Sequence, residues 1–331
     1  MVRLLHVGLG PLGRMLLSDF FARRQGELVA VVDSNPELAG REVSQLVAGA
    51  PAGLRVLASL DDVRGYDGMD SATVTTSSDL DACMDTFRVL LKQRLNVVSS
   101  CEELLYPWLR HPIHTAELHE RAVRGRSRLI GTGVNPGFLM DTLPLALTAV
   151  CNGVNSIEAW RIQDATTRRV PFQRKIGAGL HAAEFAAAAS AGTLRHVGLG
   201  ESLHFLAHYL GFELERWEEE LEPVLAERDL ECGLGPIPAG HAAGVRQVAT
   251  GWNADVPVVR LTFQAAIGQD DPHDRVRVEG NPPLDVQLRG GVHGDVATTA
   301  MLLNVLDVLE STEPGLHTMA TIPPARHKRR S

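Results

Sequence analysis

Short apolar runs alternate with amphipathic stretches over the first 135 residues of the chain. The predicted strands are Arg3–Gly8, Leu28–Asp33, Leu54–Ala58, Ala72–Thr76, Asn96–Ser100 and Arg128–Gly131. The predicted helices between them are Gly13–Arg24, Pro36–Val47, Asp79–Gln93 (with Asp79 as a plausible N-cap) and Pro112–Arg124. This alternation predicts β-α-β units with right-handed crossovers and a parallel sheet. Strands that are apolar throughout, such as residues 28–32, suit a sheet covered on both faces.

The pattern changes after Asn135-Pro136-Gly137, where strands no longer alternate with helices. A strand is predicted over Ser156–Asp164 and an alanine-rich helix over Leu180–Ala191, and the acidic run within Glu201–Glu227 is interpreted as a solvated helix face. The later predicted strands are Arg246–Trp252, Val256–Ile267, Asp274–Glu279 and Asp285–Leu288. Antiparallel pairing suits these strands because no helices intervene. A last helix is predicted over Asp295–Leu309.

These patterns predict an α/β protein with two domains. An N-terminal Rossmann dinucleotide-binding domain covers residues 1–135, and a C-terminal α+β domain with a mixed or antiparallel open sheet covers residues 136–294. The C-terminal segment 295–325, which contains the last helix, is expected to pack back on the first domain. The second domain is expected to bind substrate and to form a homodimer through its exposed sheet face.

Composition narrows the class of protein. The 331 residues are 44% hydrophobic and 22% charged, which excludes wholesale disorder. The formal net charge of −8 argues against a partner nucleic acid. No apolar stretch approaches the roughly 18 residues of a membrane span, and four scattered cysteines without a CxxC pair favour a cytoplasmic location. Only Lys92, Lys175 and Lys328 are lysines, so a lysine-based proton relay has no obvious candidate.

A glycine fingerprint follows the first predicted strand and opens the first predicted helix. In Gly8-Leu9-Gly10-Pro11-Leu12-Gly13 the first glycine would turn the chain, the second would admit a pyrophosphate and the third would allow close packing. Asp33 ends the next strand about 20 residues later, where a carboxylate binds the adenosine ribose and repels a 2′-phosphate. NAD(H) is therefore favoured, while Arg41 could reach the ribose and keeps NADP(H) open. The expected cofactor contacts here are Gly8, Gly10, Pro11, Leu12, Gly13, Asp33 and Ser34.

Polar residues gather after the fourth and fifth predicted strands. Thr76, Ser77, Ser78 and Cys101 stand where the ribose and nicotinamide of a bound cofactor would lie, although the small hydroxyl side chains would equally suit helix capping. The adjacent carboxylates of Glu102 and Glu103 invite proton transfer beside the nicotinamide. From the chemistry alone, the alternative is equally good: acidic residues are favourable in the first turn of a helix.

Several motifs together resemble the 2,4-diaminopentanoate dehydrogenase-like proteins, a group that includes the native amine dehydrogenases and is distantly related to dihydrodipicolinate reductase. They are the glycine fingerprint, residues 75–78, Ser100-Cys101-Glu102-Glu103-Leu104 with Tyr106-Pro107, residues 131–138, and residues 294–298 with Pro314-Gly315-Leu316. The resemblance spans nearly the whole chain except Ser190–Ala239. The lysine signature of dihydrodipicolinate reductase is missing, which argues against lysine biosynthesis.

The resemblance implies reductive amination of a ketone or aldehyde by ammonia, or the reverse deamination of an amine, with a nicotinamide cofactor. It also implies a catalytic glutamate after the fifth strand. Glu103 takes the place of the lysine in the Glu-Lys-Pro motif of glucose–fructose oxidoreductase-like enzymes, with Glu102 as the second candidate. Asn135 is expected to edge the nicotinamide and substrate, or to act as a turn residue before Pro136.

Two alternative functions are compatible with parts of the sequence. One is a 2,4-diaminopentanoate or related amino-acid dehydrogenase, in which Arg161, Arg168 or Arg169 would bind a substrate carboxylate instead of facing solvent. A redox-sensing NAD-binding regulator is disfavoured because the chain has no helix-turn-helix segment and no basic face.

Histidine pairs with metal-like spacing occur twice, at His204 with His208 and at His111 with His114. Neither pair shows an evident third ligand, so no metal site is predicted.

Overall fold

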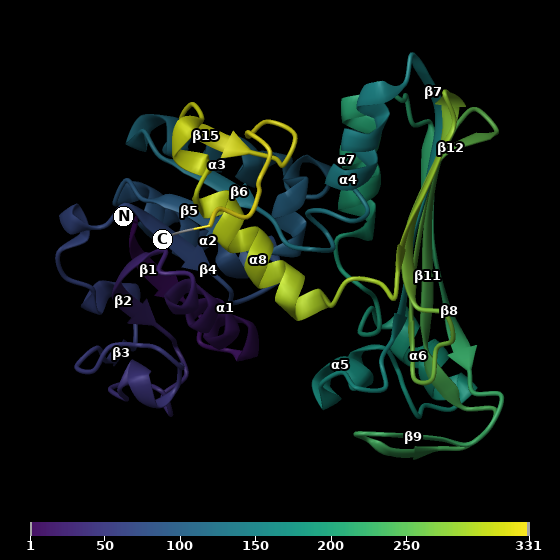
Figure 1. The fold of residues 1–331 in the computed structure, drawn as a ribbon, viewed down its shortest axis with the longest axis horizontal. Helices are drawn as coiled ribbons and strands as arrows, with labels where there is room; N and C mark the ends of the chain where they lie inside the picture. Colours follow the sequence, from purple (N-terminus) through teal and green to yellow (C-terminus); the bar gives the residue numbers. More distant parts are fainter. Residues whose placement is uncertain (1, 330–331) are drawn as a thin grey trace. The chain divides into compact units, whose positions relative to one another are not determined.

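The computed structural model describes residues 2–329, which form two compact units. Residues 2–138 and 293–329 belong to the first unit, and residues 139–292 form the second. Each unit is organised around its own sheet, as Figure 1 shows. The structure confirms the predicted class: a Rossmann-like parallel sheet with helices, and a second unit with a mixed sheet.

A seven-stranded sheet in the order β15-β6-β5-β4-β1-β2-β3 forms the centre of the first unit. Every neighbouring pair in this sheet is parallel. Its strands are β1 (Val2–Val7), β2 (Gly26–Val32), β3 (Val56–Leu57), β4 (Ser71–Val74), β5 (Asn96–Ser99), β6 (Arg128–Gly131) and β15 (Gly315–His317). Strand order reverses between β1 and β4, which is where sheets of this kind bind dinucleotides.

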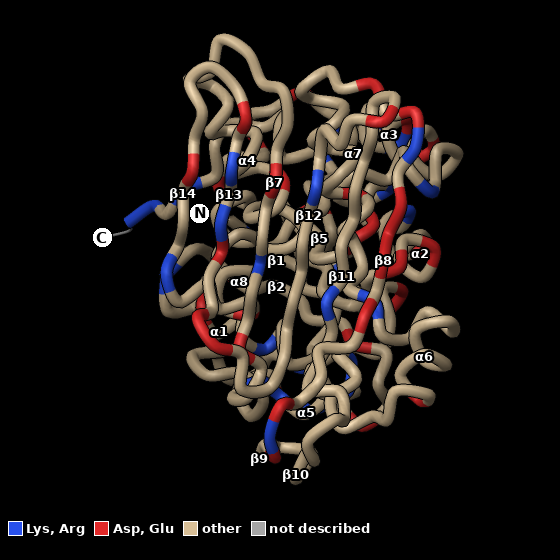
Figure 2. The backbone as a smooth tube through the Cα atoms, turned by 90° about the vertical axis from the view of Figure 1, so that its right-hand side faces the viewer, with Lys and Arg blue, Asp and Glu red and all other residues tan. Residues whose placement is uncertain are grey.

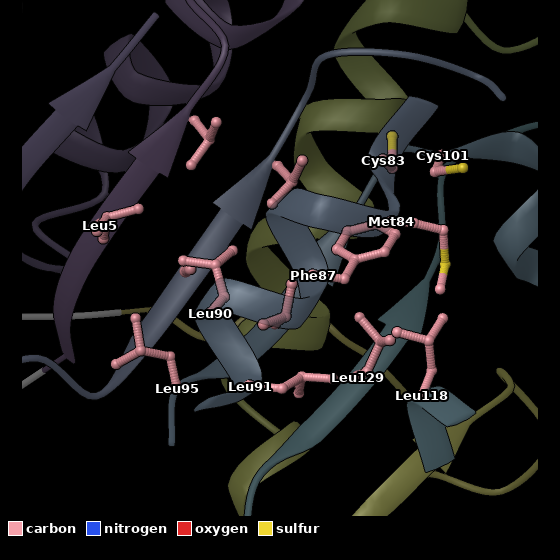
Figure 3. Packing of buried hydrophobic residues seen from close by; sticks show 14 of the residues in the cluster. Leu5, Cys83, Met84, Phe87, Leu90, Leu91, Leu95, Cys101, Leu118 and Leu129 are labelled. Atoms are coloured by element: carbon pink, nitrogen blue, oxygen red, sulfur yellow. The ribbon is translucent and has the colours of Figure 1, made fainter. Parts of the chain in front are cut away.

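Four helices of the first unit are α1 (Pro11–Ala22), α2 (Leu80–Lys92), α3 (Pro112–Gly125) and α8 (Gly294–Leu306). The apolar face of α2, which includes Phe87 and Leu90, packs against Leu5 of β1 and Leu129 of β6 (Figure 3). The predicted cap Asp79 accepts a hydrogen bond from the backbone N–H of Ala82, as the sequence indicated. The helix start next to the ends of β4 and β5 is therefore well defined.

The C-terminal segment joins the first unit by polar contacts as well as packing. Thr299 in α8 donates a 2.6 Å hydrogen bond to Asp19 in α1, and the Gln25 amide donates to the carbonyl oxygen of Leu303 at 2.6 Å. The segment also supplies the edge strand β15, which pairs in parallel with β6 and which the hydrophobic pattern did not predict.

The helix predicted over Pro36–Val47 is wrong. This segment consists of turns, a single 3₁₀ turn η1 (Val43–Gln45) and an isolated antiparallel bridge between Glu42 and Arg55. The Asn35 side chain accepts from the backbone N–H of Glu37, and Gly40 has a φ of +77°, a conformation that ends a helix. Local turn chemistry therefore overrides the apolar spacing.

A six-stranded sheet in the order β14-β13-β7-β12-β11-β8 forms the centre of the second unit. Its neighbours pair antiparallel, except that β12 and β7 run parallel. The strands are β7 (Gly153–Asp164), β8 (Arg216–Leu225), β11 (Ala242–Asn253), β12 (Val256–Ala266), β13 (His273–Asn281) and β14 (Leu284–Arg289), beside a hairpin of β9 (Leu230–Cys232) and β10 (Gly235–Ile237). The helices are α4 (Thr142–Leu147), α5 (Val170–Lys175), α6 (Ala182–Ser190) and α7 (Leu199–Leu210).

The acidic run is not a helix face, because it lies in the edge strand β8. Glu218, Glu220 and Glu222 are exposed, while the residues between them are half-buried, which is the period of a strand. Figure 2 shows the acidic residues along this strand. Charge on an edge strand discourages pairing with another chain. The preceding helix α7 ends before this strand, with Gly211 as its C-cap. Within residues 2–329, no helix is long and apolar enough to cross a membrane.

Candidate functional site

The turn between β1 and α1 has the shape that the glycine fingerprint predicts. Gly8 has a φ of +102°, and a Cβ atom there would lie 2.8 Å from the carbonyl oxygen of Thr75. A Cβ atom on Gly13 would lie 1.9 Å from the carbonyl oxygen of Gly8, whereas one on Gly10 would meet nothing within 4 Å. Two of the glycines are therefore required by the fold, and Gly10 leaves open space at the N-terminus of α1, where phosphates bind favourably.

A cavity of about 620 Å³ opens beside this turn. Its lining residues are Leu9, Gly10, Pro11, Arg14, Asp33, Asn35 and Leu38. Asp33 accepts hydrogen bonds from the backbone N–H of Leu9 at 2.5 Å and of Asn35 at 2.8 Å, which fixes the carboxylate between the two turns. A glycine turn, a helix N-terminus and a carboxylate around one cavity fit the adenosine and pyrophosphate parts of a dinucleotide. Ser34 and Leu12 do not line this cavity.

Arg14 is a cavity residue that sequence reasoning missed. Its Nε donates to the carbonyl oxygen of Leu9 at 2.8 Å, so the guanidinium is held against the glycine turn. A cation in this position would stabilise a bound phosphate. Its place in the first turn of α1 was the available signal. Arg41, the arginine considered from sequence, is exposed and does not line the cavity.

The buried side chain of His6 forms a hydrogen bond to the glycine turn. The ring is fully buried in β1, with Nε2 2.8 Å from the carbonyl oxygen of Gly8 and Nδ1 2.8 Å from the hydroxyl of Thr73. Because a carbonyl only accepts, Nε2 carries the proton and Nδ1 accepts from Thr73. Burial lowers the pKa of His6 to about 4, so the ring is neutral near pH 7. The sequence signal was a histidine inside an otherwise apolar strand.

The polar residues after β4 and β5 are tied to each other. The carbonyl oxygen of Ser78 accepts from the backbone N–H of Glu103 at 3.2 Å and from the Cys101 thiol at 3.3 Å. Ser77 accepts from the backbone N–H of Asp79, and the Thr76 hydroxyl lies 3.6 Å from the Cys83 sulfur. These contacts bring the two strand ends together, and the Cys101 side chain belongs to the buried core shown in Figure 3.

Glu103 is a buried carboxylate held by one of its two oxygens. It lies in the 3₁₀ helix η4 (Glu102–Leu105), and its side chain is 10% exposed. Oε2 accepts from the backbone N–H of Leu80 at 2.9 Å, at the N-terminus of α2, and lies 3.0 Å from Nε2 of His111. Both of these contacts are made by Oε2 rather than by Oε1. The carboxylate is thus anchored and oriented through one of its two oxygens.

Glu102 and Asn135 are the other two candidates near these strand ends. Glu102 is half-buried, with its Oε2 atom buried. Asn135 follows β6 in the same unit and is only 9% exposed. Its amide oxygen and nitrogen are both buried, and neither has a hydrogen-bond partner in the described part of the chain. A buried amide without partners is costly, so Asn135 fits a residue that bonds a ligand.

The arginine considered for a substrate carboxylate is already paired. Arg161 in β7 is 2% exposed, donates to Asp274 at 3.0 Å and donates to the carbonyl oxygen of Val292 at 3.1 Å. Burial lowers the pKa of Arg161 and raises the pKa of Asp274, so this ion pair forms despite desolvation. Arg168 lies with its guanidinium 4.3 Å from the ring centre of Phe172.

The chain is similar to proteins named as dehydrogenases of amines. It is 26% identical to a 2,4-diaminopentanoate dehydrogenase of Acetoanaerobium sticklandii, over 98% of this chain and 94% of the relative. It is 23% identical to an amine dehydrogenase of Streptomyces virginiae, over 96% and 94% of the two chains.

The fold has a close counterpart among solved structures. An amine dehydrogenase from Mycobacterium smegmatis superposes with a TM-score of 0.86 at 19% identity, covering 100% of this chain and 98% of that one. The family model described as the 2,4-diaminopentanoate dehydrogenase C-terminal domain matches residues 138–328, which is more than half of the chain. The chain therefore belongs to the family that this C-terminal domain of 2,4-diaminopentanoate dehydrogenase defines.

Proposed function

We propose that this protein is a nicotinamide-dependent amine dehydrogenase. It would convert an amine and water into a ketone or aldehyde and ammonium while the oxidised cofactor is reduced, and would catalyse the reverse amination. The observation that carries the proposal is the anchored carboxylate of Glu103, which follows a strand of the same parallel sheet that carries the dinucleotide turn. The two named relatives act on amines according to their names, which supports the same chemistry here.

The residues of the first unit fit a dinucleotide. The backbone of the Gly8–Gly13 turn and the N-terminus of α1 would hold the pyrophosphate, and Asp33 would accept from the ribose hydroxyls. The nicotinamide ring, when bound, supplies the hydride donor or acceptor for the carbon that carries nitrogen. The Asp33 carboxylate favours NAD(H), while Arg14 in the cavity keeps NADP(H) as the second candidate. Michaelis constants for both cofactors test this preference.

Glu103 would move protons through Oε1. In amination, this oxygen takes a proton from ammonium, so that neutral ammonia can attack the carbonyl carbon. The same carboxyl group then returns a proton to the hydroxyl that leaves as water, and its negative charge stabilises the resulting iminium. The Leu80 backbone N–H and His111 hold Oε2 in place throughout. Asn135 would orient the substrate or the nicotinamide through its buried amide.

Paired substitutions test the catalytic assignment. Glu103→Gln keeps an oxygen that can accept from Leu80 and His111 but cannot exchange a proton, so amination should fall by about 100-fold or more. NADH binding should stay within about twofold of the unchanged protein, because the dinucleotide turn is untouched. Glu102→Gln is the matched control and should retain most turnover. If the Glu103 variant keeps full activity, or if only the Glu102 variant loses activity, then Glu102 and not Glu103 would be the proton-transferring residue.

Deamination of 2,4-diaminopentanoate is the second candidate activity. This activity is favoured because the chain is similar, over nearly its whole length, to a protein named for that substrate. Because Arg161 is paired with Asp274, a substrate carboxylate would need another cation. A panel of simple ketones and aldehydes with ammonium, set beside oxidation of 2,4-diaminopentanoate, separates the two activities.

We also propose that the protein is cytoplasmic and forms a homodimer. The sheet of the second unit offers the surface for this association, since isologous dimers are the commonest assembly for such domains. Light scattering after size-exclusion chromatography should give twice the mass of one chain. A single-chain mass at micromolar concentration would contradict the dimer and leave the enzymatic proposal standing.

A further inference from the structure

We propose that Asp81, His111 and His114 form a binding site for a divalent metal ion of the zinc class. Asp81 lies in the first turn of α2, and the two histidines lie at the start of α3. One ligand atom from each residue lies within 4.8 Å of the others. The site belongs wholly to the first unit, and it goes beyond the proposed dehydrogenase activity without depending on it.

Two distances within this cluster are close to those around a bound metal, and the two histidine nitrogens lie within 4.8 Å of each other. Oδ1 of Asp81 lies 3.0 Å from Nε2 of His114 and 3.5 Å from Nδ1 of His111. Metal bonds of about 2.0–2.1 Å in tetrahedral geometry place neighbouring ligand atoms about 3.3 Å apart. The Asp81 side chain is 65% exposed and the His114 side chain 33%, so an ion can enter from solvent and both side chains can adjust to it.

The contacts of His111 place its second ring nitrogen beside Asp81. Glu103 lies 3.0 Å from Nε2 of His111, and a carboxylate can only accept, so Nε2 carries a proton. Nδ1, the other ring nitrogen, faces the carboxylate oxygen of Asp81 at 3.5 Å. A metal ion between Nδ1 of His111 and Oδ1 of Asp81 would bind both atoms.

Glu103 would act as the outer carboxylate of this site. Histidines that bind metals usually donate their other ring N–H to a carboxylate, which fixes the tautomer and strengthens the ligand. Glu103 already makes this contact and is itself fixed by the backbone N–H of Leu80. Two imidazoles and one carboxylate, with at least one position open to water, suit Zn²⁺ and the spectroscopic probe Co²⁺.

The test measures metal binding to the untagged, full-length protein after treatment with chelator. Titration with ZnCl₂ by calorimetry should show one ion per chain, and Co²⁺ should produce a visible absorption band that Zn²⁺ abolishes. His114→Ala and Asp81→Asn should each weaken Zn²⁺ binding by at least about tenfold. Both residues are exposed enough for these variants to fold, which thermal melting without metal checks.

His208→Ala is the matched control. It removes an exposed histidine from the other pair with metal-like spacing, on α7, and should leave the Zn²⁺ affinity unchanged. The proposal is overturned if the unchanged protein takes up no stoichiometric Zn²⁺. It is equally overturned if the Asp81 and His114 variants bind as tightly as the unchanged protein. Either result would leave the dehydrogenase proposal unaffected.

Discussion

His6 shows how a single buried side chain couples the fold to the cofactor turn. Its ring donates to the carbonyl oxygen of Gly8, which also accepts from the hydroxyl of Thr75 at 2.9 Å. The Gly8 carbonyl is thus held by two donors, and the turn is organised before any ligand arrives. Preorganisation of this kind reduces the entropy lost on binding.

The buried imidazole also makes stability depend on pH. The pKa of His6 is about 4 in the folded protein, against an ordinary value of 6.5. Between these values the unfolded chain binds a proton here and the folded protein does not, so stability falls as the pH falls. His6→Gln keeps an N–H donor for Gly8 but cannot titrate.

Urea denaturation gives the free energy of unfolding at about pH 7 and at about pH 5. Between these two pH values the unchanged protein should lose about 2 kcal/mol more of this free energy than the His6→Gln variant. Equal losses in the two proteins would show that His6 does not titrate on unfolding.

In the β1–α1 turn, one glycine is needed for packing within the fold and another leaves space for a ligand. Gly13→Ala puts a Cβ atom 1.9 Å from the carbonyl oxygen of Gly8 and 2.7 Å from Nε2 of His6. It should therefore destabilise the protein by about 2 kcal/mol or more and weaken NADH binding at least about tenfold. Gly10→Ala meets open space, so it should weaken NADH binding while stability stays within about 0.5 kcal/mol.

Urea denaturation and NADH fluorescence titration separate these outcomes. A Gly13 variant with unchanged stability and affinity would show that the turn can rearrange freely.

The elements also show what the sequence could and could not predict. The parallel unit was predictable because its apolar strands, the glycine turn and the Asp79 cap are local signals. The acidic strand β8 was not, because three consecutive glutamates hide the alternation that its pairing with β11 imposes. The bonds that anchor Glu103 depend on His111 and Leu80, which come from different elements. Sequence could place the carboxylate after β5, but not show which oxygen is held.

At the scale of the whole molecule, the first unit is assembled from two distant segments of the chain. Residues 293–331 contribute α8 and β15, and Arg128 in β6 donates to the carbonyl oxygen of Thr312. A chain ending at Val292 should lose these contacts and melt at least about 5 °C lower. A chain ending at Pro324 removes no helix or strand of the described residues and should melt within about 2 °C of the full chain. Differential scanning calorimetry checks both, and equal melting temperatures would contradict the assembly.

We infer that the anchored Glu103 and the dinucleotide turn together enable this chain to act as an amine dehydrogenase. The most direct measurement follows NADH absorbance with a carbonyl panel in the presence and absence of ammonium. We expect NADH oxidation that requires both ammonium and carbonyl, yields a primary amine, and falls by about 100-fold or more in Glu103→Gln. NADH oxidation that proceeds equally without ammonium and yields an alcohol would contradict it.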